Sequence, residues 1–121
     1  MIAVGIPNWD ANDNGNNNTG KCKIYNWNGV SWVQVGQDII GEADSDGFGW
    51  SVSLNDLGDR VAIGAPWNDG SATASGHVRI YNWNGVSWVQ MGQDIDGEAY
   101  SDNSGFKISF NSNQSSKVDL S

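Results

Sequence analysis

Apolar residues occur along this chain in short runs, separated by segments rich in Gly, Asn, Asp and Ser. In residues 50–54 serine alternates with apolar residues, and residues 60–64 are almost entirely apolar, as in a strand buried on both faces. Residues 77–83 and 87–91 follow, and an Asn-Gly pair between them is a strong signal for a hairpin turn. The sequence shows no extended 3.6-residue periodicity, so we predict an all-β chain with four antiparallel strands in this part.

The chain contains an internal duplication. Residues 24–34 recur unchanged at 80–90, and the similarity continues beyond them at the same offset of 56 residues. Upstream, residues 2–7 match residues 61–66. Four-stranded antiparallel units that repeat in this way are typical of β-propeller blades, which bury their faces by stacking on one another. We therefore expect residues 1–121 to form a single unit of two four-stranded blades.

The two ends of the chain predict how these blades are completed. The first copy begins at its second strand, whereas residues 106–110 provide a spare first strand after the second copy. Blade one, residues 2–36, would be completed by strand 106–110 of another chain, and blade two spans residues 50–95. Two blades cannot close a propeller ring. We expect homo-oligomerisation instead, as a homotrimer with six blades or, next, a homotetramer with eight.

The C-terminal segment departs from the repeat. Val118 stands where Val61 stands in the second copy, but Asp119 replaces Ala62 in a strand that is expected to be buried. Burial of an unpaired carboxylate is costly, so residues after Asn111 are expected to fray. The abrupt start and this ending also fit a fragment of a longer chain, which is the alternative to assembly.

Two short motifs resemble a known family. Phe48-Gly49 precedes the first strand of the second copy and Gly64-Ala65-Pro66 closes its second strand. Together they resemble the FG-GAP motif of the integrin α-subunit β-propeller and its bacterial relatives. The resemblance implies a non-enzymatic binding or adhesion module, extracellular or at the cell surface, with a protein or carbohydrate ligand. The alternative is a purely structural repeat of a larger surface protein, without a ligand of its own.

The candidate ligand contacts lie in the loops after the second strand of each copy. Trp9 and Trp67 each follow a Gly-x-Pro motif in a polar loop, and Asn68 and Asp69 adjoin the latter. Loops on a rigid scaffold commonly carry binding residues. The alternative for both tryptophans is packing between blades.

Calcium is the one cofactor that the sequence suggests. Residues 10–15 fit the start of the pattern D-x-[DN]-x-[DN]-G, so Asp10, Asn12 and Asn14 are the candidate ligands. Lys21 occupies the twelfth position, where the pattern needs a bidentate glutamate, and a solvated turn is the alternative. The calcium loop that the family resemblance implies, between strands one and two, is missing its alternating carboxylates in residues 55–59.

Several repeated residues are expected to have structural roles. Acidic residues follow the fourth strand in each copy, and we expect them to cap turns, with metal binding or the carboxylate pair of a glycosidase as the alternatives: Asp38, Glu42, Asp44 and Asp46, then Asp94, Asp96, Glu98 and Asp102. Trp27 with Trp32, and Trp83 with Trp88, are expected to form cross-strand pairs, with a sugar platform as the alternative.

Charge and composition exclude several classes of function. The net charge of −8 and the scattered basic residues argue against nucleic-acid binding. No run approaches the roughly 18 apolar residues of a membrane span, and the N-terminal sequence is not that of a signal peptide. The single cysteine, Cys22, excludes an internal disulfide and, at the position of Val78, is expected to pack as a small hydrophobe.

Overall fold

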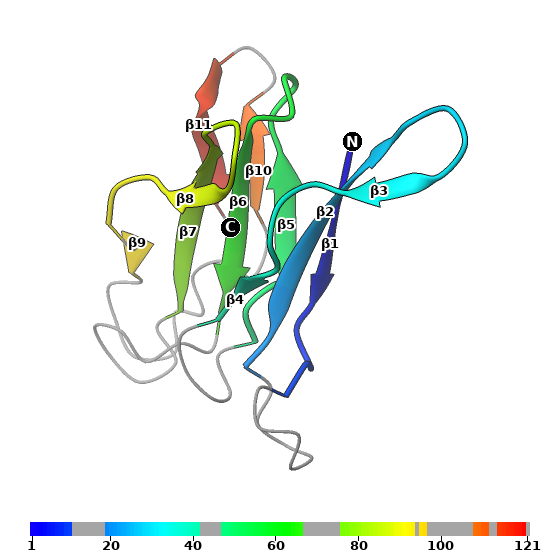
Figure 1. Ribbon diagram of the computed structural model, residues 1–121. Coiled ribbons are helices and arrows are strands. Elements are labelled where there is room, and N and C mark those ends of the chain that lie inside the picture. Colours follow the sequence, from blue (N-terminus) through cyan, green and yellow to red (C-terminus); the bar gives the residue numbers. More distant parts are fainter. Residues whose placement is uncertain are drawn as a thin grey trace.

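The computed structural model (Figure 1) describes residues 1–10, 19–41, 47–66, 76–93, 95–96, 108–111 and 114–120. Among these residues, all elements of regular secondary structure are β-strands. The first sheet contains β1 (Ile2–Ile6), β2 (Lys21–Trp27), β3 (Trp32–Gln34) and β4 (Ile39–Ile40). The second contains β5 (Ser51–Leu54), β6 (Arg60–Ala65), β7 (His77–Trp83), β8 (Trp88–Gln90) and β9 (Ile95–Asp96). A two-stranded sheet contains β10 (Ile108–Asn111) and β11 (Gln114–Leu120).

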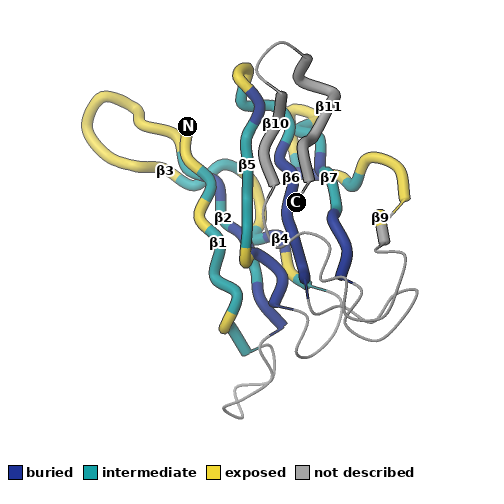
Figure 2. Tube along the Cα trace, turned by 180° about the vertical axis from the view of Figure 1, so that it is seen from behind, coloured by how far each residue is buried: buried dark blue, intermediate teal, exposed yellow. Residues whose placement is uncertain are grey.

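The predicted all-β class and the four antiparallel strands of the second copy are confirmed. These strands are hydrogen-bonded in the order β5-β6-β7-β8, with Val52 opposite Ile63 and Val61 opposite Tyr81. All residues of β6 after Arg60 are buried, as its apolar sequence predicted, and they form the dark stripe at the centre of this sheet in Figure 2. In the first sheet β1 pairs with β2 as β6 pairs with β7, so the duplicated sequence gives a duplicated sheet.

The outer strand of each sheet is interrupted, which the sequence analysis did not anticipate. β3 and β4 both pair with β2, and residues 35–38 between them leave the regular ladder. β8 and β9 repeat this arrangement on β7. The interruption keeps one hydrogen bond to the inner strand, from the Val35 N–H to the Ile24 carbonyl at 2.7 Å and from the Met91 N–H to the Ile80 carbonyl at 2.7 Å. It also lets Gly36 and Gln37 leave their own sheet.

The two sheets pack face to face through an apolar core. Alternation along β2 directs Cys22 and Ile24 to one face and Lys21, Lys23 and Tyr25 to the other. The face with Cys22 and Ile24 packs against the face of the second sheet that carries Val61, Ile63, Tyr81 and Trp88. Stacking of this kind buries faces that neither sheet could bury alone.

Phe48 and Gly49 join the sheets at the point where the chain passes from one to the other. The Phe48 side chain is fully buried and meets the Tyr81 ring edge-on, with ring centroids 6.4 Å apart. Gly49 has a φ of +96°, and a Cβ there would lie 2.6 Å from the Lys21 carbonyl oxygen. The Phe-Gly pair therefore has two roles: Phe48 fills the apolar core, and Gly49, which lacks a side chain, lets the backbone pass close to the first sheet.

The segment 114–120 corrects the prediction of fraying after Asn111. β11 pairs with β10, with Phe110 opposite Val118 and Ser109 opposite Asp119. This register repeats that of β5 and β6, where Leu54 lies opposite Val61 and Ser53 opposite Ala62. The prediction assumed a central strand like β6, but within the described residues β11 pairs with β10 alone. An edge strand accepts a charged residue that a central strand would exclude.

Candidate functional site

Trp9, the first candidate ligand contact, lies in the turn after β1 and is half-buried. Its backbone N–H donates to the Ile6 carbonyl at 3.3 Å, and its carbonyl accepts from the Gly20 N–H at 3.0 Å. The Lys21 ammonium lies over the indole, 4.4 Å from the ring centroid, in cation–π geometry. These contacts hold the ring against the start of β2.

The two candidate loops begin at the same end of the molecule. β1 and β6 run in the same direction, and their C-terminal ends lie at the lower end of Figure 1. Trp9 follows β1, and Pro66 follows β6. The other candidate ligand contacts, Trp67, Asn68 and Asp69, lie outside the described residues, as do the candidate calcium ligands Asn12 and Asn14. Asp10 is described and is half-buried beside Trp9.

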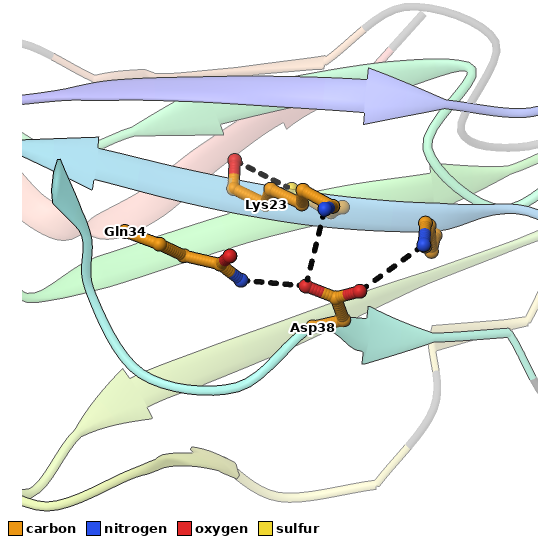
Figure 3. Close-up of polar contacts among 5 residues, drawn as sticks. Lys23, Gln34 and Asp38 are labelled. Atoms are coloured by element: carbon orange, nitrogen blue, oxygen red, sulfur yellow. Dashed lines mark hydrogen bonds and ion pairs between the residues drawn. The ribbon is translucent and has the colours of Figure 1, made fainter. Parts of the chain in front are cut away.

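Asp38, in the segment after β3, accepts polar contacts from three side chains of the first sheet (Figure 3). Its carboxylate accepts hydrogen bonds from Gln34 Nε2 at 2.5 Å and Lys21 Nζ at 3.1 Å, and Lys23 Nζ lies 3.8 Å away. The Gln34 hydrogen bond and the two lysines hold the pKa of Asp38 below its usual value. The carboxylate fastens the segment after β3 to β2, which agrees with a structural role. Asp96 lies in β9, and the remaining members of the two acidic groups lie outside the described residues.

The turn between β5 and β6 is closed by Asn55. The buried Asn55 side chain accepts hydrogen bonds from the Asp59 and Arg60 N–H groups at 3.0 and 2.9 Å, and its amide donates to the Asp59 carboxylate at 2.7 Å. This turn occupies the position where the family resemblance implied calcium. Its polar groups are organised by an asparagine side chain. Among the described residues, no three metal-ligating side chains are grouped together.

The tryptophan pairs form as predicted. Trp27 lies opposite Trp32 with ring centroids 5.4 Å apart, and Trp83 lies opposite Trp88 at 5.3 Å. Their surroundings differ strongly, because Trp32 is 53% exposed and Trp88 is 3% exposed. Cys22 is fully buried in the core between the sheets, as expected of a small hydrophobe, and burial raises the pKa of its thiol to about 12.

An apolar hollow on the first sheet was missed by the sequence analysis. It has a volume of about 300 Å³ and is lined by Ile2, Val4, Tyr25 and Trp32. The residues at the equivalent positions of the second copy, Val61, Ile63, Tyr81 and Trp88, are all buried in the core. A comparison of the two copies would have revealed this hollow, because apolar residues that are buried in one copy are expected to be buried at the equivalent positions of the other.

Comparison with known proteins supports the family resemblance. No curated protein sequence matches the chain. Among the described residues, no helix is long and apolar enough to cross a membrane. The family model of the FG-GAP repeat matches residues 41–81, roughly a third of the chain. The matched segment includes the Phe48-Gly49 crossing, β5, β6 and most of β7. Residues 41–81 are therefore an FG-GAP repeat, a module of the β-propeller type.

Proposed function

We propose that the chain is a non-enzymatic binding module, extracellular or displayed at a cell surface, with a protein or carbohydrate ligand. The FG-GAP repeat supports the module type. The observation that carries the binding role is the position of Trp9, which is held by its backbone and by Lys21 at the end of the sheets where both candidate loops begin. Binding residues of rigid β scaffolds concentrate in such loops.

The groups around Trp9 fit a ligand that has both an apolar face and hydroxyl or amide groups. The indole provides a flat apolar surface, and the Lys21 ammonium beside it is a hydrogen-bond donor. Asp10 follows Trp9 in the chain and adds a carboxylate to the same loop, and the predicted contacts Asn68 and Asp69 would add further polar groups from the second loop. A sugar ring, or an aromatic or proline side chain of a protein, has this combination of surfaces.

The proposal is tested by glycan-array binding and by capture of candidate surface proteins with the purified chain. Trp9→Ala and Trp67→Ala are each expected to abolish the signal, whereas Trp9→Phe, which keeps a flat apolar ring, should retain part of it. Circular dichroism of each variant establishes that the sheets are intact. Binding that survives both alanine substitutions would place the ligand elsewhere and contradict the proposal.

The second candidate function, a structural repeat without a ligand, is favoured by the internal contacts of the repeated residues. Asp38 fastens β3 to β2, and the Trp83–Trp88 pair packs in the core between the sheets. The absence of any binding signal on arrays and in capture experiments would favour this alternative.

The calcium site at Asp10, Asn12 and Asn14 stays a prediction. It is tested by a calcium-dependent rise in unfolding temperature that is lost in Asp10→Asn.

A further inference from the structure

Each sheet has two different faces, and among the described residues two of these four faces pack against each other. We call "leading face" the side of the first sheet with Ile2, Val4, Tyr25 and Trp32, and the equivalent side of the second sheet with Val61, Ile63, Tyr81 and Trp88. The opposite "trailing face" carries Ala3, Cys22, Ile24, Val35 and Ile39 in the first sheet, and Ala62, Val78, Ile80, Met91 and Ile95 in the second. The core joins the first trailing face to the second leading face.

The leading face of the first sheet has no equivalent cover within the described residues. Ile2, Val4 and Trp32 are 45%, 38% and 53% exposed, and with Tyr25 they line the 300 Å³ hollow. At the equivalent positions of the second sheet, Val61 and Ile63 are fully buried. Figure 2 shows the β2–β3 hairpin, which carries Trp27 and Trp32, as exposed (yellow).

The outer part of the trailing face of the second sheet is also uncovered. Ile95 is 41% exposed, whereas its equivalent Ile39 is 3% exposed. Met91 is 44% exposed, and its equivalent Val35 packs against the core. A Cβ on Gly92 would meet nothing within 4 Å, although it has the same backbone conformation as Gly36.

The contact between the first trailing face and the second leading face indicates what kind of surface each of the two free surfaces would bind. The Gly36-Gln37 segment of the first sheet lies on the Trp83–Trp88 pair of the second, and a Cβ on Gly36 would approach Trp83 to 2.6 Å. The Trp88 indole N–H donates to the Val35 carbonyl at 2.9 Å. The free surfaces carry the same elements, a Gly92-Gln93 segment on one and the Trp27–Trp32 pair on the other. The tryptophan pairs lie in identical segments, residues 24–34 and 80–90, and Gly36-Gln37 recurs as Gly92-Gln93, so the two free surfaces carry the two halves of the contact already seen between the sheets.

We propose that a second copy of this chain docks head to tail on the first. In the contact that is made, the Gln37 side-chain amide donates to the Trp88 carbonyl and accepts from the Trp88 N–H. The leading face of the second copy's first sheet would cover the trailing face of the second sheet of its neighbour, and Gln93 would bind the partner's Trp32 in the same way. The interface is heterologous, because its two halves lie on different sheets, so successive copies continue in one rotational direction until a ring closes. Three copies would give six sheets. This assembly is independent of the ligand proposed above.

Docking requires an exchange of strands at the inner edge. β10 lies beside β6 as β5 lies beside β1, and β11 pairs with β10 in the register in which β6 pairs with β5. The second copy's β1, with the sequence Ile2-Ala3-Val4, matches Val61-Ala62-Ile63 of β6 more closely than Val118-Asp119-Leu120 does. We infer that β11 occupies this position in the isolated chain and that β1 of the second copy replaces it on assembly.

The decisive experiment is size-exclusion chromatography with light scattering on the full chain over a wide range of concentrations. The expected result is a species of three chains of 13.0 kDa each that dissociates on dilution. A mass of two or four chains would support the same docking with a different number of copies. A folded chain that stays monomeric at every concentration would overturn the proposal.

Two substitutions on opposite surfaces test the interface itself. Trp32→Ala and Gln93→Ala each alter an exposed residue, and each is expected to raise the dissociation constant at least about tenfold. Because the interface is head to tail, an equimolar mixture of the two variants retains one intact pair of surfaces and should form dimers. An oligomer whose mass neither substitution changes would contradict this interface.

A third variant tests the exchange of strands. Asp119→Ala gives β11 the alanine that β6 and β1 carry at this position, so it should hold β11 on β10 and lower the fraction of assembled chain. An unchanged or increased assembled fraction would contradict the replacement of β11 by β1. Val86→Ala, at the exposed tip of the second hairpin, provides the control that should leave the mass unchanged.

Discussion

The side-chain amide of Gln37 binds the backbone of Trp88 at two points. Gln37 Nε2 donates to the Trp88 carbonyl at 2.8 Å, and Gln37 Oε1 accepts from the Trp88 N–H at 3.1 Å. The amide therefore pairs with Trp88 as a neighbouring strand would, and it satisfies backbone groups on the outer edge of β8. This pairing requires that Gln37 leave its own sheet, which the interruption between β3 and β4 permits.

Gln37→Ala is expected to destabilise the contact between the sheets. It removes both hydrogen bonds, and because the residue is exposed we expect a loss of about 1 kcal/mol in the free energy of unfolding. Urea unfolding followed by tryptophan fluorescence measures this change. Gln37→Glu, which replaces the donor by a carboxylate oxygen facing the Trp88 carbonyl, should cost more. Equal urea midpoints for the native chain and both variants would show that the pairing contributes nothing to stability.

Gly36→Ala and Gly92→Ala separate backbone strain from packing between the sheets. The two glycines have φ angles of +76° and +77°, so a side chain is strained equally at either position. Only at Gly36 would the new Cβ also meet ring atoms, at 2.6 Å from Trp83 and 2.9 Å from Trp88. We expect Gly36→Ala to lower the free energy of unfolding by about 1–3 kcal/mol more than Gly92→Ala does.

This comparison is made by urea unfolding at a dilution at which the chain is monomeric, since an assembled chain would enclose Gly92 as well. An equal decrease in the free energy of unfolding for the two variants would mean that the Gly36-Gln37 segment does not pack closely against Trp83 and Trp88 in solution.

Much of the fold could be predicted from the sequence, because alternation and the Asn-Gly turn act within one strand or hairpin. The pairing of β5 to β8 and the burial of β6 follow from such local patterns. The surroundings of the repeated tryptophans could not be predicted in this way. Trp32 and Trp88 lie in identical eleven-residue sequences but are 53% and 3% exposed, because only the second meets a neighbouring sheet. A local pattern carries no information about which face finds a partner.

The same limit applies to the candidate site. Trp9 and Trp67 could be chosen from the sequence as candidate ligand contacts, because a polar loop offers no obvious apolar neighbours for a tryptophan. The cation–π contact of Trp9 with Lys21 depends on the return of the chain at Gly20, which brings the start of β2 beside the turn after β1. Likewise, Asp38 was predicted to cap a turn, but its partners Lys21 and Lys23 come from a strand that is distant in sequence.

Asp38 is expected to make the free energy of unfolding depend on pH in the acidic range. Its pKa in the folded chain is lowered, so its contribution is fully present above the ordinary carboxyl pKa of about 3.9 and is lost as the pH falls through the lowered folded-state value. Asp38→Asn should therefore reduce the free energy of unfolding at neutral pH by up to about 1 kcal/mol. Its difference from the native chain should vanish at low pH.

Urea titrations at a series of pH values, repeated at high salt, measure this effect. Salt should reduce the part due to the two lysines and leave the hydrogen bond from Gln34 largely unchanged. A difference between Asp38→Asn and the native chain that is the same at every pH would exclude ionisation of Asp38 as its cause.

Cys22 is expected to be unreactive until the chain unfolds. Burial raises its pKa to about 12, and the thiolate, which is the reactive form, is scarce in the native chain at pH 8. Thiol labelling with a disulfide reagent should therefore be slow in buffer and fast in urea. The Cys22 contribution to stability should be full below the unfolded-state pKa of about 8.5 and lost as the pH rises toward the folded-state value.

A single accessible thiol provides the reference for this experiment. Val86→Cys in a Cys22→Val chain places the thiol on an exposed hairpin tip, and it should be labelled rapidly without urea. Cys22→Val introduces the residue that stands at the equivalent position of the second sheet, Val78, which is also fully buried, so this background should fold. If native Cys22 were labelled as fast as the hairpin thiol, the core between the two sheets would have to open far more readily than its packing indicates.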